Sequence, residues 1–135
     1  DDRFAHEVFK TPPFDGLLVS TAIVEGAPGA PGKYSLAQRH RLLRSGAREF
    51  FRLGDRASTA RIKTIGDCGA FSYVREHKPP FTVASVVDFY ANCDFDFGIS
   101  VDHVILDYDA DFDSRRRGAP AVPDALKDRQ EITLT

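Results

Sequence analysis

The sequence predicts an α/β fold with parallel strands, and three observations lead to this prediction. Segments with strand and helix character alternate along residues 14–103 in the order strand, helix, strand, helix, strand. The first strand is almost continuously apolar, as strands covered on both faces are. Each helix follows a hydroxyl residue suited to an N-cap. Alternation of this kind is typical of βαβ units with right-handed crossovers.

The first unit is expected to end near Gly54. A buried strand covers residues 14–24, and a loop rich in Gly and Pro covers residues 25–34. A helix then follows the N-cap Ser35 and stops at Gly54. Its inner face is predicted from helical spacing to contain Leu36, His40, Leu43, Ala47 and Phe50.

The outer face of this helix carries an arginine stripe, which consists of Arg41, Arg44, Arg48 and Arg52. Such a stripe is usually a solvated face. The alternative is a track for phosphate groups, which would make the chain a non-catalytic nucleic-acid-binding module. The formal net charge of -2 creates no global basic field that would favour this alternative.

The second and third units are expected in residues 62–103. A short strand over residues 62–66 leads into a turn, and Thr82 caps the next helix. The third strand covers residues 97–101, and a further helix begins at Asp124 after a charged, Pro-rich loop. The apolar face of the helix after Thr82 is predicted to contain Val83, Val86, Val87 and Tyr90.

The composition indicates one folded domain. The 135 residues are 42% hydrophobic and 28% charged, which permits a real core. No apolar run approaches the length of a membrane span, and the N-terminus does not have the pattern of a signal peptide. Two cysteines do not make a disulfide framework, and four scattered histidines have no zinc-ligand spacing. We therefore expect a cytoplasmic location and no metal site or other cofactor in this segment.

Two features indicate that the chain is part of a longer protein. The sequence contains no methionine, which a start codon would normally leave. The helix that begins at Asp124 reaches the last residue without a stop signal. We therefore expect residues 1–135 to be one partial domain, truncated at the C-terminus.

Two carboxylates are the strongest candidates for chemistry. Asp67 and Asp102 each follow the carboxyl end of a predicted parallel strand, where ligands bind in α/β folds. On successive strands they would face one pocket. The other interpretation is that both residues only cap the following turns, as Asp often does.

Neighbouring residues are suited to a flat ligand. Gly69 permits a sharp turn and close approach of the backbone, and Phe71 and Tyr73 are expected to stack on an aromatic base. His103 directly follows Asp102 and is expected either to carry protons at the rim of the pocket or to be a hydrogen-bonded structural residue.

The segment from Asp67 to Tyr73 resembles the Asp-Ser-Gly-Gly-Phe-Gln turn of queuine and archaeosine tRNA-guanine transglycosylases. Residues 82–103 resemble that family's next helix and strand, which also ends in Asp. The closer resemblance is to the DNA-modifying branch, the DpdA-type 7-deazaguanine transglycosylases, and it extends loosely to residues 129–134. Cys68, Ala70 and Ser72 stand where the tRNA enzymes have Ser, Gly and Gln.

The resemblance implies that the chain contains about the first three βα units of a TIM (β/α)₈ barrel. It also implies a pentosyltransferase that replaces guanine in DNA, or in tRNA, with a 7-deazaguanine derivative. Asp67 would be the catalytic general acid/base or base-positioning carboxylate, and Asp102 would read the base edge with Gly69, Phe71, Tyr73 and His103 nearby. The nucleophile and a structural zinc cluster would lie in later parts of the barrel, so the segment alone is expected to be inactive.

Other possibilities remain at this point. A different TIM-barrel enzyme acting on a small sugar or phosphate substrate would share the fold, as would the nucleic-acid-binding module. The sequence also leaves open partner proteins or a homo-oligomer, while it indicates no membrane partner.

Overall fold

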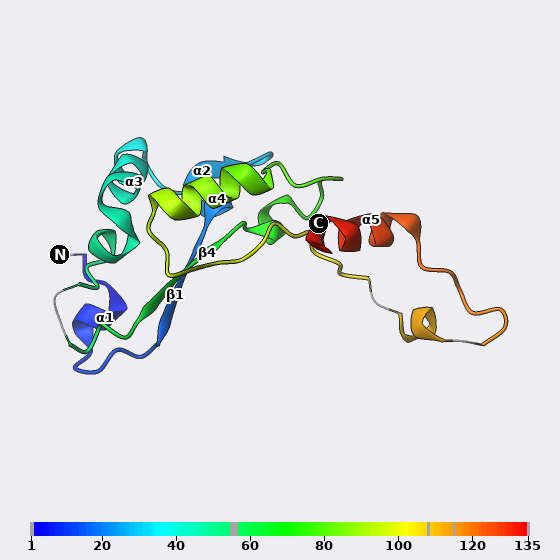
Figure 1. Ribbon diagram of the computed structural model, residues 1–135, viewed down its shortest axis with the longest axis horizontal. Coiled ribbons are helices and arrows are strands. Elements are labelled where there is room, and N and C mark those ends of the chain that lie inside the picture. Colours follow the sequence, from blue (N-terminus) through cyan, green and yellow to red (C-terminus); the bar gives the residue numbers. More distant parts are fainter. Residues whose placement is uncertain (1, 55–56, 108, 115, 135) are drawn as a thin grey trace.

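The computed structural model describes residues 2–54, 57–107, 109–114 and 116–134. Its centre is a three-stranded sheet in the order β1-β4-β5, with both neighbouring pairs parallel. The strands are β1 (Gly16–Ser20), β4 (Lys63–Asp67) and β5 (Phe97–Gly98). Helices α3 (Leu36–Phe50) and α4 (Val83–Asn92) lie on the same side of these strands (Figure 1). The predicted parallel α/β architecture is confirmed, and three parallel strands are compatible with part of a barrel.

The predicted first strand is too long. β1 ends at Ser20, and Thr21–Glu25 forms the short helix α2, followed by an antiparallel pair of β2 (Gly26–Ala27) and β3 (Ala30–Pro31). The chain turns at this point because the amide of Ala22 donates to the carbonyl of Cys68 at 3.3 Å. A continuous apolar run fits a buried helical turn as well as a buried strand, so periodicity alone did not separate the two.

Helix α3 begins as predicted but changes direction inside. Ser35 caps it, and the amide of Gln38 donates to the Ser35 hydroxyl at 3.2 Å. Gly46 then adopts φ 75° and ψ 165°, which interrupts the helix, and the Ala47 amide donates to the carbonyl of Cys93 at 2.7 Å.

Most of the predicted inner face of α3 is wrong. Leu36 is 67% exposed, and His40 and Leu43 are also exposed. Leu42 and Ala47 are the residues of α3 that are buried. The exposed residues of the predicted face all precede Gly46, so the apolar spacing selected a face of this helical piece other than the one that buries Leu42.

The second unit is closer to the prediction. β4 begins and ends one residue after the predicted strand, and α4 starts after Thr82, whose hydroxyl accepts from the Ser85 amide at 3.1 Å. The predicted apolar face of α4 is only half correct, because Val86 is buried whereas Val83 and Val87 are exposed. The third strand is shorter than predicted, since only Phe97 and Gly98 pair with β4. The last predicted helix is confirmed as α5 (Asp124–Leu134).

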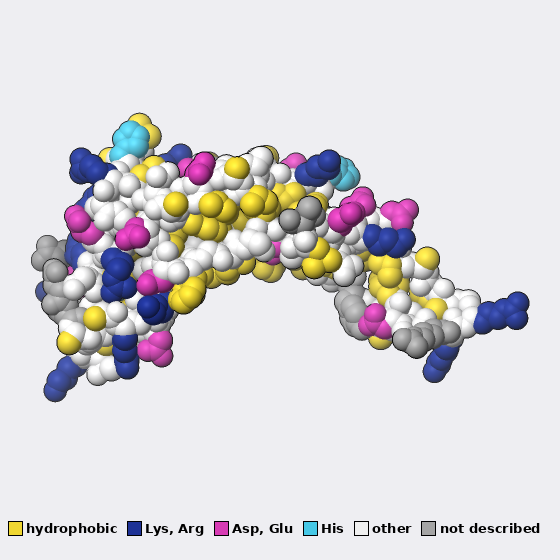
Figure 2. Space-filling model, viewed as in Figure 1, with side chains coloured by type: hydrophobic (Ala, Val, Ile, Leu, Met, Phe, Trp, Pro, Cys, Tyr) yellow, Lys and Arg dark blue, Asp and Glu magenta, His cyan; other side chains and the backbone are white. Residues whose placement is uncertain are grey.

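The unpaired side of β5 borders an apolar groove. The groove has a volume of about 480 Å³ and lies between α4 and the segment that contains β5. Figure 2 shows apolar side chains gathered over this part of the molecule. Large exposed apolar residues on or near the groove include Val83, Val87, Phe97 and Ile99. Among the described residues, no helix has the length and apolar character to cross a membrane.

The ring of Tyr90 determines how closely α4 approaches the sheet. Gly66 of β4 and Gly98 of β5 are partners in register. A Cβ added at Gly66 would lie 2.5 Å from Tyr90 Cε1, and one at Gly98 would lie 2.9 Å from Tyr90 Cε2. The Tyr90 hydroxyl donates to the carbonyl of Ile99 at 3.0 Å. The ring therefore lies across both glycines, and neither position has room for a side chain.

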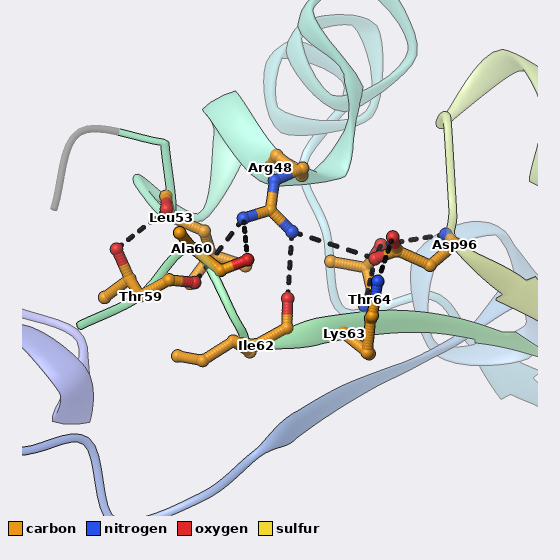
Figure 3. Close-up of polar contacts among 8 residues, drawn as sticks. All are labelled: Arg48, Leu53, Thr59, Ala60, Ile62, Lys63, Thr64 and Asp96. Carbon is orange, nitrogen blue, oxygen red and sulfur yellow. Dashed lines mark hydrogen bonds and ion pairs between the residues drawn. The ribbon is translucent and has the colours of Figure 1, made fainter. Parts of the chain in front are cut away.

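A polar network joins α3 to the amino ends of β4 and β5 (Figure 3). Arg48 Nη1 donates to the carbonyl of Ile62 at 2.8 Å and lies 3.7 Å from Asp96 Oδ2. The same carboxylate accepts from the amide of Thr64 at 2.8 Å and from its hydroxyl at 3.0 Å. Hydrogen bonds from the amide and hydroxyl of Thr64, together with the nearby Lys63 ammonium, hold the pKa of Asp96 below its usual value. One member of the predicted arginine stripe is therefore a structural residue.

Replacing Gly66 with Ala is expected to lower the free energy of unfolding by about 1–3 kcal/mol, because the new Cβ displaces the Tyr90 ring. Chemical denaturation measures this change. Gly54→Ala is the matched control, since a Cβ there meets no atom of the described residues within 4 Å, and its effect should stay within about 0.5 kcal/mol. Equal effects of the two substitutions would contradict the proposed packing.

Arg48→Met is expected to destabilise the fold by about 1–3 kcal/mol, because it leaves the Ile62 carbonyl and the Asp96 carboxylate without this donor. Arg44 lies on the same helix and is exposed, so Arg44→Met should change stability by less than about 0.5 kcal/mol. Thermal denaturation of the two variants compares them directly. If Arg44→Met cost as much as Arg48→Met, the network would not be the source of the effect.

Candidate active site

The carboxyl ends of the central strands bring the two predicted carboxylates together. Asp67 is the last residue of β4 and lies in register with Ser20, the last residue of β1. Asp102 follows β5 by four residues and is partly exposed. The two charges are close enough for Asp102 to raise the pKa of the Asp67 carboxyl. Asp67 and Asp102 therefore lie near each other at or beyond the carboxyl ends of neighbouring strands, and that they face one pocket stays a prediction.

The environment of Asp67 favours its protonated form. Burial is the main cause that raises the pKa of this carboxyl, and the negative charge of Asp102 adds to it. The backbone amides of Gly69 and Cys68 donate to the carboxylate and lower its pKa in part. Paired carboxyl groups in different environments can serve as an acid/base group and a fixed acceptor.

Gly69 shapes the turn between these residues. It has φ +86°, a left-handed conformation that favours glycine, and a Cβ there would lie 2.7 Å from the Ala22 Cβ. The turn after β4 is thus packed directly against the end of β1. Gly69 allows the backbone of this turn to approach the backbone after β1 closely. Its Cα faces Ala22 of the protein rather than an open surface for a ligand.

The two aromatic residues predicted to stack on a base differ in exposure. Phe71 lies in the short helix η1 (Ala70–Tyr73) and is 76% exposed. Tyr73, at the other end of η1, is 1% exposed and packs edge-on against Phe81 and His103. Phe71 is therefore accessible to a ligand, whereas the ring of Tyr73 is covered.

Cys68 is a contact of Asp102 that the sequence did not reveal. Its Sγ donates to Asp102 Oδ1 at 2.8 Å, and the Tyr73 hydroxyl lies 3.0 Å from the same sulfur. The Tyr73 hydroxyl also lies 3.2 Å from the backbone carbonyl of Asp102, which accepts from it. Burial raises the pKa of Cys68 and that of Tyr73, so both groups keep their protons. No spacing rule connects residue 68 with residue 102, and only the fold brings them together.

His103 occupies a structural position. It is 3% exposed, and its Nε2 lies 2.7 Å from the carbonyl of Glu76. A carbonyl oxygen only accepts, so Nε2 carries the proton in this contact. Of the two interpretations of His103, the geometry favours the hydrogen-bonded structural residue.

Helix α5 secures the segment that follows His103. Arg129 donates to the carbonyl of Val104 at 2.6 Å and to that of Val74 at 3.0 Å. One guanidinium therefore connects α5 both to the segment after Asp102 and to the turn after η1. Within the described ranges, no group of three or more His, Cys, Asp or Glu side chains has a geometry that could hold a metal ion.

Two partly buried carboxyl groups at the carboxyl ends of neighbouring parallel strands are an arrangement typical of α/β enzymes. No protein-family model matches the chain. Over all 135 residues the chain is 44% identical to a DNA-guanine transglycosylase of Salmonella montevideo. The chain spans 30% of the length of that protein. This similarity to part of a DNA-guanine transglycosylase agrees with the resemblance to tRNA-guanine transglycosylase-like enzymes that the motifs carry.

Stability should depend on the ionisation of Asp67 in a defined direction. A carboxyl whose pKa is raised on folding binds its proton more tightly in the folded state, so ionisation lowers stability as the pH rises above the ordinary value of 3.8. The variant Asp67→Asn cannot ionise. Its stability relative to the unmodified chain should therefore increase with pH through this range and then become constant. Denaturation at a series of pH values measures this difference, and a difference that falls with rising pH would contradict the burial argument.

Proposed function

We propose that the chain is part of a base-exchange transglycosylase, a pentosyltransferase that replaces guanine in DNA with a 7-deazaguanine derivative. The observation that carries the proposal is the 44% identity, over all 135 residues, with a DNA-guanine transglycosylase. DNA is preferred to tRNA as the substrate because that protein's name specifies DNA. The target nucleotide would be flipped out of the helix to reach the site.

The candidate site has groups suited to this chemistry. In the exchange, guanine leaves the sugar carbon and takes a proton, and the incoming base loses one. Asp67, whose pKa burial and Asp102 raise, would donate the first proton and accept the second. Asp102 would accept hydrogen bonds from the N–H groups of a guanine edge, since an ionised carboxylate only accepts. Phe71 is the exposed aromatic residue that would stack on a base.

We also propose that the sheet is the beginning of a TIM barrel. β5 is an edge strand of the described sheet, and it lies beside an apolar groove where large apolar residues are exposed. A further βα unit would cover these residues. The nucleophilic carboxylate that the resemblance implies is not assigned to a residue of this chain, and the 135 residues alone should not exchange bases.

The arginine stripe supports the nucleic-acid-binding alternative less well. Arg48 is used in the network with Ile62 and Asp96, and Arg52 forms an ion pair with Glu7 at 3.2 Å. Arg41 lies over the Phe50 ring, 5.8 Å from its centroid, so three of the four arginines have intramolecular partners. No observation specifically favours a TIM-barrel enzyme acting on a small sugar or phosphate.

A base-exchange assay with the full-length natural protein tests the proposed function. The protein should incorporate labelled guanine into duplex DNA, and it should do so faster than into tRNA. Asp67→Asn and Asp102→Asn should each lower kcat/KM by about 100-fold or more, since each removes a group in contact with the base. Asp88→Asn, at an exposed position of α4, should leave the rate within twofold. Absence of exchange, or equal loss in all three variants, would contradict the proposal.

A further inference from the structure

Asp102 is held in place by side-chain contacts rather than by backbone pairing within the sheet. The last backbone contact between β5 and β4 that the structure records is the Ile99 amide donating to the Gly66 carbonyl at 2.8 Å. In the described part of the chain, strand pairing does not extend to residues 100–103. A residue outside the ladder needs other contacts to keep its orientation. For Asp102 these contacts come from Cys68 and Tyr73.

A chain of hydrogen bonds connects buried side chains of the core to the Asp102 carboxylate. Tyr73 is 1% exposed and Cys68 is fully buried, so both have few alternative orientations. The Tyr73 hydroxyl contacts the Cys68 sulfur and the Asp102 carbonyl at 3.0 and 3.2 Å. Cys68 then donates its S–H proton to Asp102 Oδ1 at 2.8 Å. This contact restricts rotation of the carboxylate about its Cβ–Cγ bond and leaves Oδ2 and the second lone pair of Oδ1 for further donors.

We propose that Cys68, held by Tyr73, is a positioning residue that orients the Asp102 carboxylate for the donor edge of a guanine-like base. The inference rests on the proposed function and adds to it the group that determines base specificity. A carboxylate accepts from the ring N–H and the exocyclic amino group of guanine together only when its plane is aligned with the base. Cys68 supplies this alignment without contacting the base.

The orientation of Asp102 should matter more for some bases than for others. Hypoxanthine has the same ring N–H as guanine but lacks the exocyclic amino group. A correctly oriented carboxylate gains a second hydrogen bond from guanine, whereas a freely rotating one gains less. Loss of the Cys68 contact should therefore reduce the preference for guanine over hypoxanthine, which a general loss of stability would not do.

The experiment measures exchange of guanine and of hypoxanthine by the full-length natural protein and its variants. Cys68→Ala removes the S–H donor and should lower the guanine-to-hypoxanthine ratio of kcat/KM by about tenfold, mainly through a higher KM for guanine. Tyr73→Phe should lower the same ratio, because it removes the hydroxyl that holds Cys68. Cys68→Ser retains a donor and should keep the ratio within about threefold of the unmodified protein.

Cys93→Ala is the matched control. Cys93 is also fully buried, but it belongs to the other part of the core, around Leu42 and Phe89. Its truncation should lower stability as that of Cys68 does and leave the ratio unchanged. If Cys93→Ala changed the ratio as strongly as Cys68→Ala, or if Cys68→Ala left it unchanged, Cys68 would not be a positioning residue.

The proposed function and this inference fail in different ways. If the unmodified protein exchanges neither base, the proposed function is wrong, and the role of Cys68 at a base is wrong with it. If the unmodified protein prefers guanine and Cys68→Ala retains that preference, only the role of Cys68 is wrong.

Discussion

The close packing of Tyr90 on two adjacent glycines is the constraint on which the rest of the structure depends. Gly66 and Gly98 face each other across the pairing of β4 and β5, and the ring lies over both. The missing side chains allow α4 to approach the sheet closely, and the Tyr90 hydroxyl binds the Ile99 carbonyl just beyond β5. One side chain thus determines the distance between helix and sheet and the direction in which the chain leaves β5. Asp67 follows the first glycine directly, and Asp102 follows the second by four residues.

The two ends of the sheet are stabilised by different means. At the amino ends, Arg48 and Asp96 connect α3, β4 and the residue before β5 through charged hydrogen bonds. At the carboxyl ends, buried and mostly uncharged contacts predominate, with Tyr73, Cys68 and the His103 ring against the Glu76 carbonyl. An ion-pair network next to the site would compete for the Asp102 carboxylate. Among the residues that the structure describes, neither Asp67 nor Asp102 forms an ion pair with a Lys or Arg side chain.

The sequence predicted the parts of the fold that depend on local signals. Ser35 and Thr82 cap their helices as expected, because each is followed three residues later by a side chain that completes a capping box. β4 and α5 were also placed within one residue. The failures occurred where tertiary contacts override periodicity. Gly46 breaks α3 because the Ala47 amide binds Cys93, a residue of a distant segment, and no local pattern announces that contact.

The site was predicted to a similar extent. Position at strand ends was enough to predict that Asp67 and Asp102 lie near each other, because parallel strands place their carboxyl ends on one edge. The roles of Tyr73 and Cys68 could not be found in this way. A tyrosine in a turn is suited to stacking on a ligand or to donating a hydrogen bond inside the core, and burial decides between these uses. Here burial places Tyr73 in the core and leaves Phe71 exposed.

The asymmetry between the two carboxyl groups follows from their neighbours. Asp67 is partly buried at the end of a strand, and its donors are backbone amides that cannot move with the side chain. Asp102 lies outside the ladder, and its donor is a thiol that is itself held by a tyrosine. Burial and the nearby negative charge raise the pKa of Asp67, while the S–H of Cys68 donates a hydrogen bond to the Asp102 side chain. Two residues of the same type at the same edge of one sheet are thereby suited to different tasks, one to exchange protons and the other to accept hydrogen bonds.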